Sequence, residues 1–268
     1  MNTFRVVSFG CFLGATLFAV GCSKSSPPQS ESKMEAAPAK PVAYFHVDPA
    51  TAGEVTGKIT FSGKAPARKK IDMDEDPQCA GEHKGGFIWD ESVAVGSKHA
   101  LGNVFVYIKK GLEDKKFEPP SDPVVVDQHG CWFAPRIVAM QAGQALKVTN
   151  SDPVTHNIHP RSQVNREWNQ NQPSGAPPII RKFFDKPEVM IRVKCNIHPW
   201  MKAWIGVVDN PYFAVTESNG EFDFKNVPPG TYTLEAWQEE LGTQEQQVTV
   251  AASGKATAEF AFKGEGRQ

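Results

Sequence analysis

The stretch KCNIHPWM, residues 194–201, places Cys195, His198 and Met201 at intervals of three residues. It is preceded by the β-branched run EVMIRVK and followed by AWIGVVD, so it is expected to form a tight connection between two strands. Cysteine, histidine and methionine are all ligands of soft or borderline metal ions. The stretch therefore indicates either a metal site at a strand end or buried core residues that happen to have this spacing.

Strand signals also dominate the rest of the chain. Short alternating or β-branched runs, such as EVTGKITFSG (54–63), NVFVYIKKG (103–111) and QALKVTNSD (144–152), recur between Gly, Pro and Asn residues. Such spacing is typical of β-sandwiches and barrels. With 268 residues, of which 40% are hydrophobic and 22% charged, the chain is long enough for one large or two ordinary domains. We therefore predict an all-β fold.

A second candidate ligand follows a different expected strand. The stretch NSDPVTHNIHP (150–160) continues the run QALKVTN and contains His156, Asn157 and His159. Two histidines and one cysteine in a plane, with a distant axial methionine, describe a blue-copper electron-transfer site. Zinc is the main alternative metal, because it suits cysteine and two histidines, although methionine is a poor zinc ligand.

Together these two stretches resemble the cupredoxins, and the Cys-x-x-His-Pro-aromatic-Met loop is closest to that of the amicyanins. The resemblance covers roughly residues 103–210 and implies a Greek-key sandwich with one type 1 copper site. The implied ligands are His156, Cys195, His198 and Met201. Asn157 would brace the ligand loops by hydrogen bonds, and His159 is the alternative to His156. The resemblance also implies that His198 lies at an exposed apolar end, as the exit for the electron.

The C-terminal segment has a different pattern. SNGEFDFKNVPPGTYTLEAW (218–237) resembles the carboxypeptidase regulatory-like (transthyretin-like) sandwich, in which Gly-x-Phe-x-Phe precedes Pro-x-Gly-x-Tyr-x-Leu. Only about 55 residues follow Pro211, which is short for a complete sandwich. We therefore expect the strand 54–61 to join the C-terminal sheet or to bridge both sheets.

The N-terminal segment resembles a targeting sequence. Arg5 precedes a mostly apolar run that ends in LFAVGC (17–22), which is similar to the lipobox of bacterial lipoproteins. Cys22 would then carry lipid and become the mature N-terminus; an ordinary secretory signal is the alternative. The following polar tract cannot bury enough apolar surface to fold and is expected to be a tether. Ser23 fits sorting to the outer membrane, so the resemblance implies a periplasmic location with attachment by the lipid anchor only.

Of the five cysteines, three remain once Cys11 and Cys22 are set aside. In an oxidising envelope two of these three should pair. We predict a disulfide between Cys79 and Cys131, because both lie in turn-like contexts, DPQCAGEH and DQHGCWF. A second metal site that uses Cys79, His83 and His129 is the alternative. The sequence contains no CxxCH motif for covalent haem attachment.

These patterns divide the chain into four parts: a signal peptide at 1–22, a disordered tether at 23–50, a cupredoxin-like domain at 51–210 and a carboxypeptidase regulatory-like domain at 211–268. Within the third part, residues 69–99 and 161–178 are polar with few strand signals and are expected to be long loops. We expect the loop 161–178 to cover the metal site, with Trp168 as a lid. The acidic stretch IDMDEDP (71–77) is expected to be an exposed loop, with cation binding as the alternative.

Charge is unevenly distributed, although the net charge of −1 gives no indication of a nucleic-acid partner. Between residues 161 and 202 there are eight Lys or Arg against three Asp or Glu; from residue 209 onward there are four against ten. The first group could steer an acidic redox partner such as a c-type cytochrome, or could be a solvated face. Its relevant members are Arg161, Arg166, Arg181, Lys182, Lys186 and Lys202.

The favoured function is that of a tethered type 1 copper protein that carries electrons between redox partners. Copper storage or delivery is a second hypothesis, and a structural envelope protein with a degenerate copper site is a third. An enzyme is the weakest hypothesis, because the sequence has no His-x-His pair for a trinuclear copper cluster, no Ser/His/Asp arrangement and no phosphate-binding glycine loop.

Overall fold

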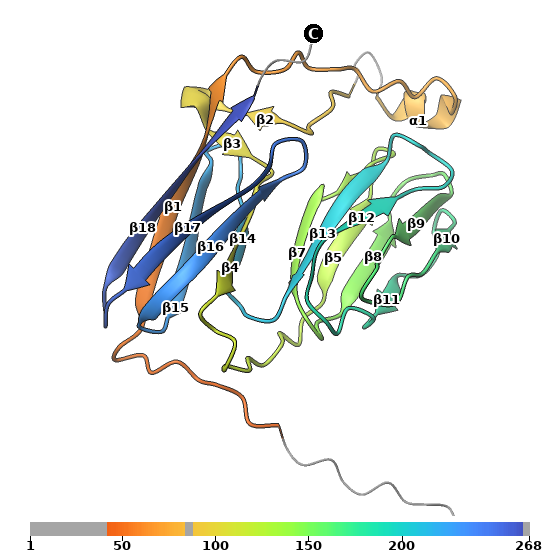
Figure 1. Cartoon of the computed structure of the whole chain (residues 1–268). Helices are drawn as coiled ribbons and strands as arrows, with labels where there is room; N and C mark the ends of the chain where they lie inside the picture. Colours follow the sequence, from red (N-terminus) through yellow and green to blue (C-terminus); the bar gives the residue numbers. More distant parts are fainter. Residues whose placement is uncertain (1–41, 84–87, 265–268) are drawn as a thin grey trace, which may run out of the picture. The chain divides into compact units, whose positions relative to one another are not determined.

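The computed structural model describes residues 42–83 and 88–264, and nearly all of their regular structure is β (Figure 1). This agrees with the predicted all-β class. Within these two ranges no helix has the length and apolar character needed to cross a membrane. The signal peptide at 1–22, with Cys22, and residues 23–41 of the expected tether lie outside the described residues.

One group of strands, the terminal sandwich, combines the first strand of the chain with the last ones. A three-stranded sheet has the order β15 (Glu221–Val227), β1 (Gly53–Gly63), β18 (Lys255–Gly264). A four-stranded sheet has the order β14 (Phe213–Val215), β4 (Phe105–Lys110), β16 (Gly230–Gln238), β17 (Gly242–Val250). Apolar side chains from both sheets form one core.

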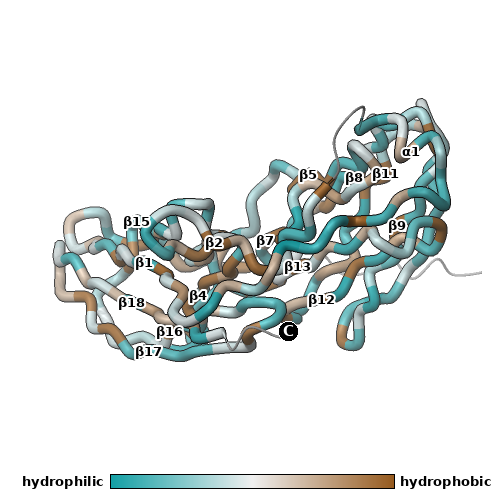
Figure 2. Tube along the Cα trace, turned by 90° about the horizontal axis from the view of Figure 1, so that it is seen from above, coloured by the Kyte–Doolittle hydropathy of each residue, from teal (hydrophilic) through white to brown (hydrophobic). Residues whose placement is uncertain are grey.

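The strand β1 lies between β15, with which it pairs antiparallel, and β18, with which it pairs parallel. The expectation that the segment 54–61 joins the C-terminal sheet is therefore confirmed. Gly57 makes this position possible, because a Cβ atom there would lie 2.2 Å from the Phe222 ring and 2.3 Å from the Ala258 carbonyl oxygen. Alternating apolar and polar residues along β15 and β18 place one face of the sheet in the core (Figure 2).

A second group, the central sandwich, contains the strands between residues 124 and 208. Its five-stranded sheet has the order β10 (Gln170–Gln172), β9 (His156–Pro160), β12 (Glu188–Lys194), β13 (Lys202–Val208), β7 (Ile137–Gln141). Its four-stranded sheet has the order β11 (Ile179–Arg181), β8 (Leu146–Asn150), β5 (Val124–Gln128), β6 (Phe133–Ala134). A separate apolar core fills the space between them.

Sheet membership does not follow the expected boundary between residues 210 and 211. The strands β1 and β4 come before this boundary, yet they pair with strands that come after it. The proposed division into domains stays a prediction, but the sheets are shared across it. A smaller apolar cluster of Phe105, Tyr107, Ile137 and Val208 connects strands of the two sandwiches.

The segment 69–99 contains short regular elements that the sequence did not indicate. The helix α1 (Pro77–Glu82) begins after Asp76, whose side chain accepts from the backbone N–H groups of Gln78 and Cys79, and Pro77 occupies the first turn. The 3₁₀ helix η1 (Ser97–His99) lies between the short strands β2 (Ala94–Val95) and β3 (Leu101–Gly102). Six residues are too few to show an apolar periodicity, which explains why α1 was not predicted.

Residues 42–50 differ from the expected tether. Phe45 packs edge-on against Phe117, with ring centroids 5.5 Å apart, and its backbone N–H donates to the Lys116 carbonyl. Residues 42–50, VAYFHVDPA, are less polar than the tract before them, and Phe45 attaches this described part of the expected tether to the terminal sandwich.

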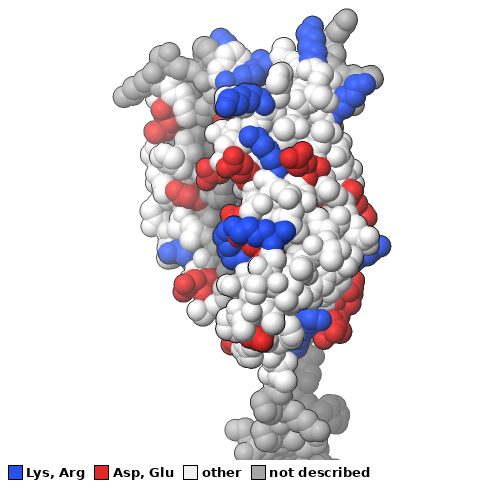
Figure 3. Space-filling model, turned by 90° about the vertical axis from the view of Figure 1, so that its left-hand side faces the viewer, with Lys and Arg blue, Asp and Glu red and all other residues white. Residues whose placement is uncertain are grey.

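Charges of both signs are interspersed on the face that carries the β1 sheet (Figure 3). Glu54 on β1 forms ion pairs with Lys225 on β15 and Lys255 on β18, and Lys58 lies opposite Glu221. Cross-strand pairs therefore bring opposite charges together on the exposed face of this sheet.

Candidate metal centre

The loop 195–201 connects β12 to β13 and is closed by its own backbone. Cys195 N–H donates to the Met201 carbonyl over 3.3 Å, and Met201 N–H donates to the His198 carbonyl over 3.1 Å. The backbone N–H groups of Ile197 and His198 both point at the Cys195 sulfur, at 3.4 and 3.3 Å. The loop therefore directs the cysteine and the histidine to the same side and supplies two donors to the sulfur.

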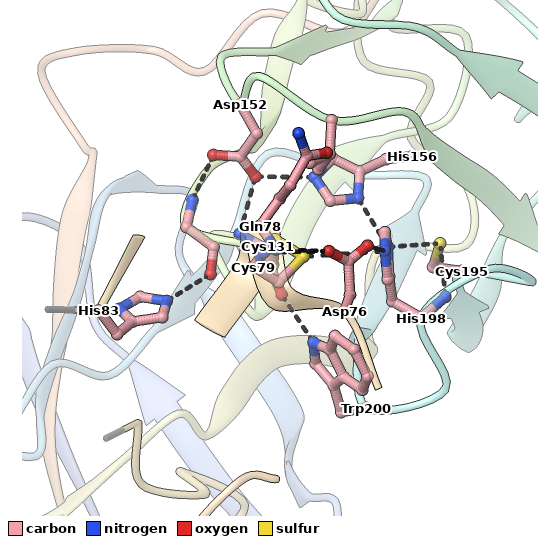
Figure 4. The surroundings of a disulfide bond; sticks show 12 residues. Asp76, Gln78, Cys79, His83, Cys131, Asp152, His156, Cys195, His198 and Trp200 are labelled. Carbon is pink, nitrogen blue, oxygen red and sulfur yellow. Dashed lines mark hydrogen bonds and ion pairs between the residues drawn. A yellow bond between two sulfur atoms is a disulfide. The ribbon is translucent and has the colours of Figure 1, made fainter. Parts of the chain in front are cut away.

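Three ligand-capable side chains meet at this loop. The Nδ1 atoms of His156 and His198 are 3.0 Å apart, and the Cys195 sulfur is 3.7 Å from His198 Nδ1. All three donor atoms lie within 4.8 Å of one another, and the three residues are 0, 2 and 3% exposed for His156, His198 and Cys195. Figure 4 shows His156 next to His198, whose rings meet edge to face, and Cys195 beside His198.

These separations fit a bound metal ion. An ion about 2.0–2.3 Å from each donor leaves pairs of nitrogen and sulfur donors roughly 3–4 Å apart, and both measured separations lie in that range. One thiolate and two imidazoles form a donor set for copper or zinc. Met201 is completely buried in the same apolar cluster as Cys195, and its role as an axial ligand stays a prediction.

The environment of Cys195 favours the thiolate. Burial raises the pKa of this thiol, but hydrogen bonds from His156 and from the backbone N–H groups of His198 and Ile197 outweigh burial, so the pKa is lowered overall. A thiolate is the form that binds metal.

Asn157 connects the two ligand-bearing segments, as the cupredoxin resemblance implied. Its side-chain oxygen accepts from the backbone N–H of Asn196, in the ligand loop, over 3.1 Å. Its amide nitrogen donates to Asn169 at 2.6 Å and to Asn171 at 2.8 Å. Asn169 and Asn171 belong to the loop 161–178, so this loop supports the site through its contacts with Asn157.

His159 does not join the group. It lies on the same strand as His156, but its two ring nitrogens contact Asn196 at 3.3 Å and Glu167 at 2.7 Å. Of the two candidate histidines, the structure brings His156 to Cys195 and His198, and it directs His159 to the surface.

The expectation of an exposed His198 is wrong. Asp76, at the start of α1, lies 3.0 Å from His198 Nε2, and the Cys79 sulfur lies 3.7 Å from the same atom. The Trp200 ring lies beside the imidazole with centroids 5.1 Å apart, and its Nε1–H donates to the Cys131 carbonyl. The segment 69–99 and Trp200 therefore cover the imidazole edge that was expected to face solvent (Figure 4).

Trp168, the expected lid, has other neighbours. It is part of the central core, its ring centroid lies 6.3 Å from that of Phe183, and the Arg181 guanidinium lies 5.9 Å from it. The cover over His198 comes instead from the segment that was expected to be a separate polar loop.

Cys79 and Cys131 form a disulfide, with Cα atoms 5.6 Å apart, in agreement with the predicted pairing. The alternative second metal site loses its sulfur ligand as a result. Its two histidines also have other neighbours: His83 Nε2 lies 2.9 Å from the Gly130 carbonyl, and His129 Nδ1 lies 3.8 Å from Asp152 Oδ1. Among the described residues Cys195 is the free cysteine.

Two carboxylates at the site were missed by sequence reasoning. Asp152 Oδ2 accepts from His156 Nε2–H over 2.7 Å, and Asp76 has the equivalent position at His198. Burial lowers the pKa of His156, but the Asp152 carboxylate and the Cys195 sulfur together outweigh it and raise the pKa to about 8. The hydrogen bond from His198 lowers the pKa of Asp76. The position of Asp152, four residues before His156, is a signal in the sequence that could have identified it. Asp76 had no such signal, because it belongs to the stretch that was expected to be an exposed acidic loop.

The chain is similar in part to solved copper proteins. The copper-containing nitrite reductase of Thermus scotoductus SA-01 is 22% identical, with a TM-score of 0.31, over 38% of this chain and 25% of that chain. A purple cupredoxin from Nitrosopumilus maritimus is 17% identical, with a TM-score of 0.27, over 31% of this chain and 98% of its own. A reduced Cu(I) form of an amicyanin mutant is 18% identical, with a TM-score of 0.26, over 38% of this chain and 97% of that chain.

Other comparisons concern the sequence. Residues 205–258 match the family model for domain II of polysaccharide lyase family 4. This model differs from the carboxypeptidase regulatory-like family that the segment 218–237 resembles, so that assignment stays a prediction. No curated protein matches the chain. The chain spans about a quarter of the length of the nitrite reductase it resembles.

Proposed function

We propose that this chain is a type 1 copper protein that exchanges single electrons with a redox partner. The observation that supports this most directly is the buried group of His156, Cys195 and His198, whose donor atoms lie within 4.8 Å of one another. Met201, in the same loop, is the fourth ligand in this proposal. When bound, copper would supply a one-electron couple between Cu(II) and Cu(I).

The protein residues would keep this group rigid and dry. The two N–H groups directed at the Cys195 sulfur limit its movement, and Asn157 fixes the ligand loop to the neighbouring strand. A ligand set held in one arrangement moves little when the charge of the metal changes, and this favours fast electron exchange. Trp200 is half-buried and its ring contacts the His198 ring, so it is the aromatic side chain that lies between the buried ligand and the surface.

A second candidate function is copper storage or delivery, and the covered position of His198 favours it. An imidazole edge closed by Asp76, the disulfide and Trp200 is shielded from direct contact with a redox partner.

In the carrier proposal, a c-type cytochrome is the partner class that the basic residues between 161 and 202 would attract. Some of these already have internal contacts, since Arg166 and Arg181 both lie over the Phe183 ring, whereas Lys182 and Lys186 are exposed.

Optical and EPR spectra of the copper-loaded protein test the proposal. We expect an intense visible band from charge transfer between the Cys195 thiolate and Cu(II), which disappears on reduction and returns on oxidation. Cys195→Ala should abolish the band. Ile197→Ala is the matched control, because Ile197 is exposed in the same loop and the substitution keeps all four proposed ligands. A colourless protein that binds only Cu(I) would support storage or delivery, and a band that persists in Cys195→Ala would show that the ligand assignment is wrong.

We also propose that the chain is held at a bacterial membrane by lipid on Cys22, with the folded part in the periplasm. The motif LFAVGC and the polar tract after it support this proposal. We expect Cys22→Ala to abolish incorporation of labelled fatty acid and to prevent stable membrane attachment, with fractionation as the measurement. Cys11→Ala is the matched control. Equal fatty-acid labelling of the Cys22→Ala variant and the unaltered protein would contradict the proposal.

A further inference from the structure

We propose that Asp76 is a positioning residue for the metal group, which orients His198 from the start of the α1 segment. The inference rests on the proposed function, because it concerns the same ligand set. It assigns a role to a residue 122 positions away from His198 in the sequence.

The contact between Asp76 and His198 determines which imidazole nitrogen is available. Asp76 Oδ2 lies 3.0 Å from His198 Nε2, while His198 Nδ1 lies 3.0 Å from His156 Nδ1 and 3.7 Å from the Cys195 sulfur. A carboxylate only accepts hydrogen bonds, so Nε2 carries the proton. The lone pair of Nδ1 is then directed toward the other two ligands, as metal binding requires.

Asp76 is itself held in place through its other oxygen. Oδ1 accepts from the backbone N–H groups of Gln78 at 2.9 Å and Cys79 at 3.2 Å, at the beginning of α1. The disulfide between Cys79 and Cys131 ties the same helix to the central sandwich. The carboxylate therefore has one oxygen fixed by the helix and one oxygen available to His198, which leaves its side chain little freedom to turn.

The second histidine has a parallel arrangement, which supports a functional role for the first. Asp152 Oδ2 lies 2.7 Å from His156 Nε2, and the Asp152 carboxylate also accepts from the N–H groups of Gly130 and Cys131. In each histidine, the ring nitrogen directed away from the sulfur thus contacts a carboxylate. The Asp152 side chain is 1% exposed and that of Asp76 is 27% exposed, so Asp76 is the one that can be changed with less disturbance of the core.

Loss of the Asp76 charge is expected to weaken metal binding. Partners that hydrogen-bond to a metal-ligating histidine raise its basicity and fix its orientation, and their removal typically costs about 10–100-fold in metal affinity. A nearby negative charge also stabilises Cu(II) relative to Cu(I), so its removal should raise the reduction potential.

The substitution Asp76→Asn separates these effects from helix capping. Asparagine caps a helix about as well as aspartate does, so its oxygen can keep the contacts with Gln78 and Cys79. Its amide nitrogen then takes the place of Oδ2 and donates toward His198. We expect His198 to change tautomer, with the proton moved to Nδ1.

Asp76→Ser is a second variant that keeps a capping oxygen and removes the contact with His198. Asp74→Asn is the matched control, because Asp74 is exposed in the same segment.

Two measurements decide the inference. In metal-free protein, ¹⁵N NMR of the histidine rings should show His198 protonated on Nε2 in the unaltered chain and in Asp74→Asn, but not in Asp76→Asn. Competition with a chelator should show Cu(I) or Cu(II) bound about 10–100-fold more weakly by both Asp76 variants than by Asp74→Asn. Thermal unfolding monitors whether the fold is retained.

An unchanged tautomer together with a copper affinity within about twofold of the control would overturn the inference. Failure of the proposed function has a different result: the unaltered chain would then lack the thiolate band, while the NMR measurement, made without metal, would still decide the role of Asp76.

Discussion

Replacing Cys79 and Cys131 together by alanine is expected to lower the free energy of unfolding by about 4 kcal/mol, because the disulfide closes a long loop in the unfolded chain. The two cysteines are 52 positions apart in the sequence. Both are completely buried in a small apolar cluster with Met73 and Val154, so alanine avoids the additional cost of burying a hydroxyl group. Guanidinium unfolding of the variant and of the unaltered protein under oxidising conditions measures the difference.

The unaltered protein treated with a thiol reductant serves as the control, since it should lose a similar amount of stability. A loss below about 1 kcal/mol in both samples would contradict the prediction and would indicate that the native state or residual structure compensates for the cross-link. The same variant should also exchange the backbone amide hydrogens of residues 78–82 faster, because the disulfide is the covalent attachment of α1 to the central sandwich.

Arg136→Ala is expected to lower the free energy of unfolding by about 3–5 kcal/mol, the range found when one partner of a buried ion pair is removed. The Arg136 and Glu239 side chains are 4 and 5% exposed, and the guanidinium binds both carboxylate oxygens, at 2.6 and 3.2 Å. After the substitution, the Trp204 indole remains a donor to Glu239, and the negative charge remains buried without its cation. Urea unfolding measures the loss.

The double variant Arg136→Met with Glu239→Leu separates the penalty of an unpaired charge from the contribution of the pair. We expect it to recover most of the lost stability, because apolar residues of similar volume often replace a buried ion pair at little cost. If Arg136→Ala costs less than about 1 kcal/mol, the prediction is wrong and the buried pair contributes little to the free energy of unfolding.

The parts of the site that were predictable came from a short spacing and from a family resemblance. Cys195 and His198 share one loop, so their spacing alone indicated that they lie together. His156 is 42 positions before His198, and its assignment followed from the resemblance of the His-Asn pair to that of the cupredoxins. The cysteine pair followed from the number of cysteines and from turn-like contexts. Asp76 was not predictable, because a carboxylate in an acidic stretch resembles any solvated residue until the fold brings it to a histidine 122 positions away.

The fold shows the same limit. The run NVFVYIKKG predicted a strand within residues 103–111, but the partners of β4 are β14 and β16, which follow it by more than 100 residues. A pattern of period two specifies which face of a strand is buried and does not specify its neighbours. Residues 54–61 were placed correctly because a recognisable C-terminal pattern lacked enough strands, so the missing one had to come from elsewhere in the chain.

The place of β1 between β15 and β18 has a consequence for how the protein is made. At roughly 5–20 residues per second on the ribosome, β1 is synthesised roughly 10–40 seconds before β18. During that interval its apolar residues Val55, Ile59 and Phe61 have no completed sheet to enter. The terminal sandwich can close only after β18 has been translated, so a chain interrupted before residue 255 leaves β1 without its parallel partner and with an open sheet edge.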